Sequence, residues 1–209
     1  MREYPKIETA WNREGKYVVP GSYRLPELES IKRFVATEKV DGTNIRIGLH
    51  DARLLIGGRT DNAQVPTPLL EYLMATFTVE KLLAQFPDGN FTLFGEGYGP
   101  KIQGGGNYRS TASFRLFDVL VAQWWLEPMN VVEVANSLGI EYVPALGLLE
   151  AIPRSADELR IIVDASVVAS QDGGSGRRAE GIVARPVPML LNRKGERLLW
   201  KLKFRDFHP

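Results

Sequence analysis

The sequence predicts an α+β domain in which antiparallel sheets are flanked by a few helices. Short extended segments rich in β-branched and aromatic residues dominate the chain, whereas only three stretches show the apolar spacing of a helix. The length of 209 residues, 44% of them hydrophobic, suffices for one substantial core. No shift in composition marks a boundary, so we expect a single domain over residues 1–209.

Seven segments are predicted as strands because Gly, Asp or Asn bounds them and their residues favour extended backbone. They are residues 37–40, 44–49, 53–56, 90–94, 114–121, 181–185 and 198–204. In the last segment, side-chain alternation places Lys201 and Lys203 on one face and Leu202 on the other. Two lysines on one face require either water or a polyanion as their partner.

Three helices are predicted from apolar spacing and from end signals. The first covers residues 69–86 and stops before Pro87, and the second covers residues 127–138 and ends at Gly139. The third begins at Ser155, which has capping-box spacing to Glu158.

The composition excludes several kinds of protein. With 26 basic and 25 acidic residues the net charge is +1, which gives no overall preference for nucleic acid. The absence of cysteine excludes disulfides and Cys-based zinc sites, and His50 and His208 are too few for a His-based metal triad. A catalytic metal would therefore need oxygen ligands. No apolar run approaches about 20 residues and the amino terminus has no signal-peptide core, so we expect a cytosolic protein without a membrane span.

The most specific segment is Glu38-Lys-Val-Asp-Gly-Thr-Asn44, in which a lysine ends one predicted strand and an Asp-Gly turn leads to the next. A tight turn would fix the amine of Lys39, as a nucleophile requires. A surface turn with the same residues would explain the segment equally well. Other residues of this chemistry follow in order: Arg59 after a strand, Glu96 between glycines, Phe117, Glu180, and the pair Lys201 and Lys203.

In this order, the motifs resemble the covalent nucleotidyltransferase superfamily of polynucleotide ligases and capping enzymes. The greatest similarity is to ATP-dependent RNA ligases of the type of the second RNA ligase of phage, and it covers nearly the whole chain. It includes residues 4–12, 38–44, 95–103, 117–118, 180–186 and the lysine pair. The resemblance implies one nucleotidyltransferase domain, an ATP-grasp-like ligase adenylation domain, over residues 1–209. Because the sequence stops at Pro209, soon after the lysine pair, we expect no appended C-terminal or OB domain.

The resemblance implies that Lys39 attacks the α-phosphate of ATP and holds AMP as a phosphoramidate. AMP then passes to a 5′-phosphate of RNA, and a 3′-hydroxyl displaces it to seal the strand. The implied cofactors are ATP and Mg²⁺ or Mn²⁺, with Glu180 and Glu96 on the metal side. By position, the implied nucleotide contacts are Glu38 (adenine), Phe117 (stacked on the base), Asn44, Arg59, Glu96, and the α-phosphate pair Lys201 and Lys203. A free lysine has a pKa of about 10.4, so the metal and neighbouring cations would have to disfavour its charged form.

Two departures from the family leave alternatives open. Asp41 stands where phage-type RNA ligases often have histidine, and Lys-x-Asp-Gly is equally typical of DNA ligases and capping enzymes. A DNA ligase, a capping-type guanylyltransferase and a non-catalytic nucleotide- or RNA-binding module are therefore the alternatives. Relatives usually carry a further domain, so a partner could aid binding of RNA ends or a nicked duplex. RNA phosphates are expected at Arg177 and Arg178, or at Arg193, Lys194 and Arg197.

Overall fold

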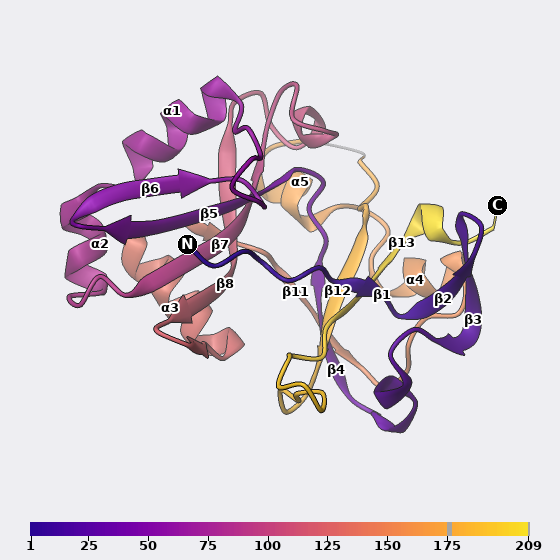
Figure 1. The fold of residues 1–209 in the computed structure, drawn as a ribbon. Helices are drawn as coiled ribbons and strands as arrows, with labels where there is room; N and C mark the ends of the chain where they lie inside the picture. The colour runs from indigo at the N-terminus through magenta and orange to yellow at the C-terminus, as the bar shows by residue number, and fades with distance from the viewer. Residues whose placement is uncertain (175–176, 209) are drawn as a thin grey trace. The chain divides into compact units, whose positions relative to one another are not determined.

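A computed structural model describes residues 1–174 and 177–208 (Figure 1). The fold consists of two compact units, where the composition had marked no boundary. Unit 1 contains Met1–Pro5, Asp41–Val143 and Asp172–Gly174, and unit 2 contains Lys6–Val40, Pro144–Gln171 and Ser175–Pro209. The chain passes from unit 2 to unit 1 between Val40 and Asp41, within the lysine motif.

Unit 1 is built on a six-stranded sheet with the order β10-β8-β7-β5-β6, in which β9 also pairs with β8. Its strands are β5 (Thr43–His50), β6 (Arg53–Gly57), β7 (Phe91–Tyr98), β8 (Ser113–Val121), β9 (Trp124–Trp125) and β10 (Glu141–Tyr142). The pairs are antiparallel except β10 with β8, which is parallel. The predicted strand at 90–94 continues to Tyr98, through the two glycines that flank Glu96.

Three helices supply apolar side chains to the core of unit 1: α1 (Thr67–Thr76), α2 (Val79–Gln85) and α3 (Pro128–Leu138). The prediction of a single helix over residues 69–86 is therefore wrong in one respect, because this segment forms two helices. Extended backbone at Phe77 ends α1, and Thr78 caps α2 by accepting a hydrogen bond from the Lys81 amide. The predicted end of α3 is confirmed, since Gly139 adopts a left-handed φ of 58°. A short 3₁₀ turn, η2 (Gly105–Asn107), follows β7.

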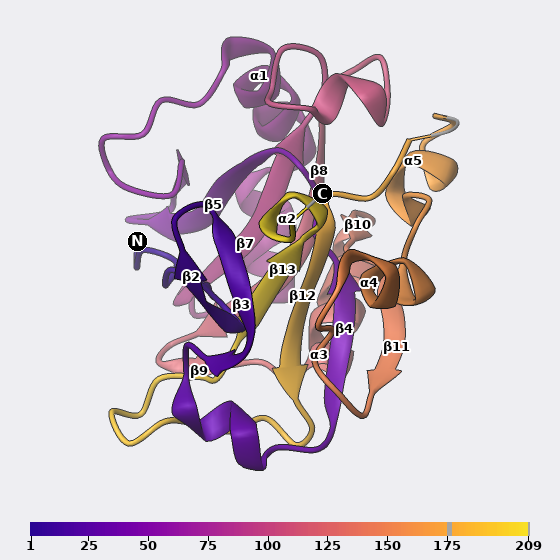
Figure 2. The same cartoon turned by 90° about the vertical axis from the view of Figure 1, so that its right-hand side faces the viewer.

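Unit 2 is built on a five-stranded sheet with the order β1-β13-β12-β4-β11, and Figure 2 shows β13, β12, β4 and β11 next to one another. Its strands are β1 (Glu8–Thr9), β4 (Phe34–Glu38), β11 (Ala145–Leu149), β12 (Gly181–Pro186) and β13 (Trp200–Lys203). A separate hairpin joins β2 (Trp11–Glu14) to β3 (Tyr17–Tyr23). The β1–β13 pair is parallel and the other sheet pairs are antiparallel. All seven predicted strands are present in the two sheets, so the α+β class is confirmed; the two parallel pairs were not predicted.

Side chains of alternate residues on one face of this sheet form the core of unit 2, with Phe34, Ile182 and Trp200 fully buried in it. The remaining elements are η1 (Pro26–Ser30), α4 (Ala156–Ile162), α5 (Val167–Gln171) and η3 (Phe204–Asp206). The predicted cap of α4 is confirmed, because the Ser155 hydroxyl accepts a hydrogen bond of 3.1 Å from the Glu158 amide. Within residues 1–174 and 177–208, no helix combines the length and apolar character that a membrane crossing requires.

Candidate active site

Three ionisable residues meet where the central strands of unit 2 end. Lys39 follows β4 directly, and its backbone amide donates a 2.9 Å hydrogen bond to the carbonyl of Gly181. Glu180 precedes β12, and the register pairs Gly181 with Lys203 at the end of β13. The antiparallel ladder therefore brings together residues that lie up to 164 positions apart in the sequence.

The Glu180 carboxylate lies between two lysine ammonium groups. Its Oε2 is 2.7 Å from Lys39 Nζ, and its Oε1 is 2.5 Å from Lys203 Nζ. All three side chains are mostly buried, with exposed fractions of 20% for Lys39, 11% for Glu180 and 14% for Lys203. The exposed Arg205 guanidinium lies 3.8 Å from the same Oε1. The cluster therefore holds more positive than negative charge, as a site for a phosphate group requires.

Opposing effects set the pKa of Glu180. Burial alone would raise its pKa, but attraction to Lys39 and hydrogen bonds from Lys203 and Lys39 outweigh burial and hold the pKa below its ordinary value. Glu180 is therefore a carboxylate at neutral pH. It acts as the counter-ion of two lysines rather than as a proton donor.

Lys201 lies on the same face of β13 as Lys203, as the alternation predicted. The burial pattern of β13 alternates, with Trp200 and Leu202 in the core and both lysines half-buried on the other face. Lys201 pairs in register with Val183 of β12 and with Thr9 of β1. Both lysines of the predicted α-phosphate pair therefore belong to the face that carries no core residues.

Glu38 points away from Lys39, because neighbouring residues of an extended chain project to opposite faces. Its side chain is buried, and its carboxylate accepts hydrogen bonds from the Ser166 hydroxyl and, at 3.0 Å, from the Val168 amide. The Ser166 hydroxyl in turn accepts a 3.0 Å bond from the Ala169 amide. Glu38 thus anchors the start of α5, a role that the sequence did not predict. Its predicted contact with adenine stays a prediction.

Unit 1 carries the other predicted nucleotide contacts. Asn44 of β5 lies opposite Glu96 of β7 in the register, and both are half-buried on the face opposite Ile45, which belongs to the core. The Asn44 Oδ1 is buried and accepts no hydrogen bond from the described residues. Phe117 interrupts the regular β7–β8 register and is half-buried, with its ring edge-on to Tyr4 at a centroid distance of 5.0 Å. Asn44, Glu96 and Phe117 are thus partly buried polar and aromatic side chains on β5, β7 and β8 of unit 1.

Arg59 lies exposed in the loop after β6. The neighbouring Arg46, which the sequence did not single out, is buried and holds this loop. It donates hydrogen bonds of 2.6 Å to the Gly58 carbonyl and 2.8 Å to the Asp61 carboxylate. Arg46 occurs in the middle of an apolar strand, and an arginine there could have been suspected of a structural role because a buried cation needs partners.

A second buried polar network in unit 1 was also not predicted. The Tyr98 hydroxyl donates a 2.7 Å hydrogen bond to Asp172, and Arg115 contacts both residues at 3.0 Å. Burial and the Asp172 carboxylate, opposed by Arg115, raise the pKa of Tyr98 to about 12. The phenol therefore stays protonated and donates to Asp172, which makes this network structural rather than catalytic.

The residues of the site fit a divalent metal only if phosphate oxygens of a nucleotide supply part of its ligands. The described residues contain no group of three His, Cys, Asp or Glu side chains placed to hold a metal ion. The predicted metal-side residues Glu180 and Glu96 belong to different units. Mg²⁺ in proteins takes one or two carboxylates and keeps several waters or phosphate oxygens as its other ligands. The single Glu180 carboxylate beside two lysines therefore fits an ion that binds together with a nucleotide.

A family model described as RNA ligase matches residues 32–203 of the chain. No curated protein matches it. Among solved structures, the chain is similar to a mutant Naegleria gruberi RNA ligase with ATP and Mn (19% identity, TM-score 0.64, 96% of this chain and 61% of that one). It is also similar to the ligase with PPi (20%, 0.64, 96% and 61%) and to a mutant with AMP and Mn (19%, 0.63, 95% and 59%). The chain thus spans about three-fifths of these proteins, and the likeness shows a shared fold.

Proposed function

The chain belongs to the RNA ligase family, and from that premise we propose that it is an ATP-dependent RNA ligase that forms a lysyl-AMP intermediate on Lys39. The observation that carries the proposal is the contact of the Glu180 carboxylate with both Lys39 and Lys203, at 2.7 and 2.5 Å. A surface turn would leave Lys39 in water. Here the Lys39 side chain is mostly buried and its amine is held by Glu180, whose other oxygen contacts Lys203, so the amine lies in a site with excess positive charge, as attack on a phosphate requires.

In the first step, the lone pair of Lys39 Nζ attacks the α-phosphorus of ATP. A P–N bond forms, the P–O bond to the β-phosphate breaks, and pyrophosphate leaves with the bonding electrons. Lys203, with Lys201 on the same face of β13, neutralises charge that develops on the α-phosphoryl oxygens. Arg205 lies at the edge of the cluster and adds a further positive charge there.

The Lys39 ammonium must release one proton to solvent before its nitrogen can attack, and the nitrogen releases a second proton to solvent as the P–N bond forms. In the structure its ammonium is paired with the Glu180 carboxylate, which favours the charged form and therefore keeps the amine unreactive until a nucleotide is bound. A bound Mg²⁺ or Mn²⁺ supplies positive charge that disfavours the ammonium form and neutralises phosphoryl oxygens. The Naegleria gruberi structures with ATP and Mn, or AMP and Mn, support this pair of cofactors. Glu180 would hold the metal once Lys39 releases it.

We assign the nucleoside to the residues of unit 1. Phe117 offers a partly exposed ring for the adenine, and the buried, unsatisfied Asn44 Oδ1 needs a donor that a ligand can provide. Glu96 lies beside Asn44 in the register and suits a ribose or phosphate-side contact, as Arg59 does from its exposed loop. The proposed nucleotidyltransferase domain spans residues 1–209.

The later steps transfer AMP to RNA. A 5′-phosphate oxygen attacks the phosphorus of the lysyl-AMP, and the P–N bond breaks as Lys39 regains a proton. A 3′-hydroxyl then attacks the activated 5′-phosphate, AMP leaves, and the strand is sealed. We propose RNA ends or a nicked duplex as substrates, with a further domain or partner protein assisting their binding.

The test is the intact mass of the protein after incubation with ATP and Mg²⁺, with GTP in a parallel sample. One AMP should be added to the native protein and to Lys32→Ala, which removes an exposed lysine of the same unit. It should be absent from Lys39→Ala. A GMP adduct would assign capping chemistry instead, and sealing of DNA but not RNA nicks would assign a DNA ligase. No adduct in folded protein already free of AMP would favour a non-catalytic binding module.

A further inference from the structure

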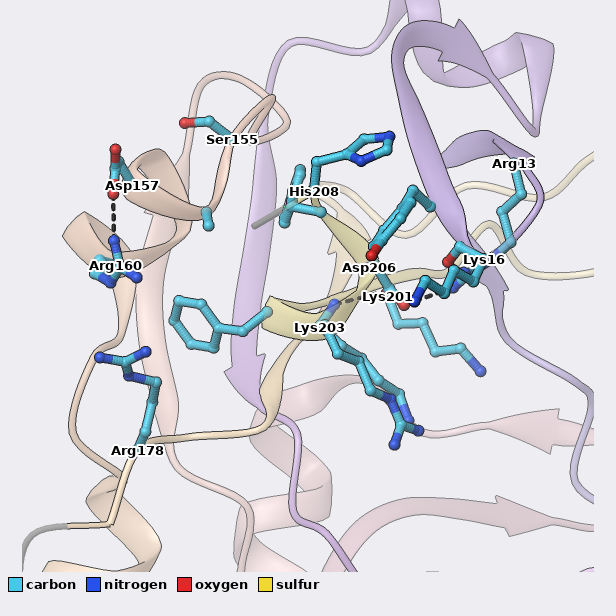
Figure 3. A pocket seen from close by; sticks show the side chains of 15 residues that line it. Arg13, Lys16, Ser155, Asp157, Arg160, Arg178, Lys201, Lys203, Asp206 and His208 are labelled. Atoms are coloured by element: carbon cyan, nitrogen blue, oxygen red, sulfur yellow. Dashed lines mark hydrogen bonds and ion pairs between the residues drawn. The ribbon is translucent and has the colours of Figure 1, made fainter.

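A basic hollow of about 990 Å³ opens in unit 2 beside the proposed catalytic lysines (Figure 3). It is lined by the β2–β3 hairpin, by α4 and its cap, by Arg178 ahead of β12, and by β13 with the segment around η3. Arg160 and Arg178 lie on one side, Arg13 and Lys16 on the other, and Lys203 lies between them. With Lys201 and Arg205 the hollow has seven basic residues in its lining, against two acidic ones, Asp157 and Asp206.

Several of these cations have acidic partners that phosphates can replace. Arg160 contacts Asp157, and Arg178 lies 3.2 Å from Asp164, with more than half of both side chains of the second pair exposed. Exposed ion pairs of this kind are weak, so a phosphate that accepts two hydrogen bonds can compete for the guanidinium groups. By contrast, Arg13 lies 2.6 Å from the buried Asp206 and is held in place. The exchangeable charge is therefore on the α4 side of the hollow.

Aromatic rings alternate with the cations. The Arg178 guanidinium lies over the ring of the half-buried Phe204, 5.6 Å from its centroid. On the other side, the rings of Tyr17 and His208 are tilted by 35° with centroids 3.9 Å apart, and Lys16 lies 5.0 Å from the Tyr17 ring centroid. An inorganic anion needs only the charges, whereas rings interleaved with cations are typical of sites for single-stranded nucleic acid, whose bases stack while its phosphates are neutralised.

We infer that this hollow binds the unpaired nucleotides at the end of an RNA strand, with the backbone along Arg160 and Arg178 and a base on Phe204. It is large enough for more than one phosphate, and Lys203 in its lining belongs to the catalytic cluster. The inference rests on the proposed function, because it assigns the polynucleotide of that reaction. The inference also places the RNA phosphates away from Arg193 and Lys194, which were predicted as contacts but do not line the hollow.

The test is the affinity of the ATP-free protein for a 5′-phosphorylated single-stranded RNA, measured by fluorescence anisotropy over a range of salt concentrations. We expect Arg160→Glu and Arg178→Glu each to weaken binding at least about fivefold. Each should also make the dependence of log affinity on log salt concentration shallower, by about 0.7 for every RNA phosphate that the variant no longer neutralises. Phe204→Leu, which keeps an apolar side chain but removes the ring, should weaken binding about tenfold. The control is Lys32→Glu, a reversal at an exposed lysine outside the hollow, which should bind as the native protein does.

Three results would overturn the inference. If Arg160→Glu and Arg178→Glu bind RNA as tightly as Lys32→Glu does, the hollow is not part of the RNA-binding surface. Weakening by Arg193→Glu alone would place the RNA on the other predicted cluster. Weaker binding of ATP, with unchanged binding of RNA, would make the hollow a triphosphate site. Arg160→Gln and Arg178→Gln repeat the test with milder changes should a reversal impair folding. Because the assay uses no ATP and needs no adduct, its failure is distinct from the failure of Lys39 to become adenylated.

Discussion

Replacement of Glu180 by glutamine tests the electrostatic reasoning at the site. Glutamine keeps the shape of the side chain but removes the charge that two lysines share, at 2.7 and 2.5 Å. A hydrogen bond to a charged group contributes about 1.5–3 kcal/mol, and glutamine also avoids the cost of burying a carboxylate. Because the two effects oppose each other, we expect Glu180→Gln to lower the free energy of unfolding by about 2 kcal/mol at pH 7.

The lowered pKa of Glu180 also predicts how this loss of stability depends on pH. The pKa of Glu180 is below its ordinary value of 4.5, so its charge stabilises the fold above that pH, and the contribution disappears as pH falls through the lowered pKa. The stability difference between native and Glu180→Gln should therefore be full at pH 7 and shrink only below pH 4.5. Urea unfolding followed by tryptophan fluorescence measures it, since Trp11 and Trp200 are buried in unit 2. A difference that stays constant into acid, or a more stable variant, would refute the reasoning.

Three further predictions concern single residues. Lys203→Ala should slow the formation of the AMP adduct by about 10²–10³-fold in single-turnover kinetics, because it removes charge aimed at the α-phosphate; an unchanged rate would exclude that role. Glu38→Ala should destabilise the protein by about 1–3 kcal/mol and speed hydrogen exchange at α5, because the Ser166 hydroxyl and Val168 amide lose their acceptor; unchanged exchange would contradict the anchoring role. Phe117→Leu should weaken ATP binding about three- to tenfold in calorimetry, because stacking of an aromatic pair contributes about 0.5–1.5 kcal/mol; equal affinity would leave Phe117 a packing residue.

Local sequence signals predicted most of the fold. Strands with alternating or β-branched residues and helices with end signals such as Ser155 and Gly139 were found where expected, because burial and capping act over a few residues. The break between α1 and α2 was missed because Phe77 continues the apolar pattern while its backbone is extended. The parallel pairing of β1 with β13 depends on contacts far apart in the chain, which no local pattern reports.

The site was predicted in part for the same reason. Alternation alone placed Lys201 and Lys203 on one face. The order of the motifs led to Lys39 and to Glu180, whose carboxylate contacts both Lys39 and Lys203 in the structure. Glu38 and Lys39 are adjacent in the sequence, but their side chains contact different residues. Motif position could not show that Glu38 anchors α5, because Ser166 lies 128 residues away.

Most of the basic hollow could not be predicted from the sequence, because its lining comes from four distant segments, and only Arg178 and the pair Lys201 and Lys203 had been singled out as phosphate contacts. The cations of the β2–β3 hairpin, of α4 and of the C-terminal segment occur singly or in pairs along the chain and resemble an ordinary solvated surface there. Only the folded arrangement places them around the rings of Tyr17 and Phe204.

The identity of the adenylated residue is the most direct test of the account. The protein would be incubated with ATP and Mg²⁺, digested, and the peptide that carries AMP sequenced by mass spectrometry under conditions that preserve a P–N bond. The account predicts one AMP on the side chain of Lys39 and none in the Lys39→Ala protein. AMP on Lys201 or Lys203 instead, or an adduct that persists in Lys39→Ala, would contradict it.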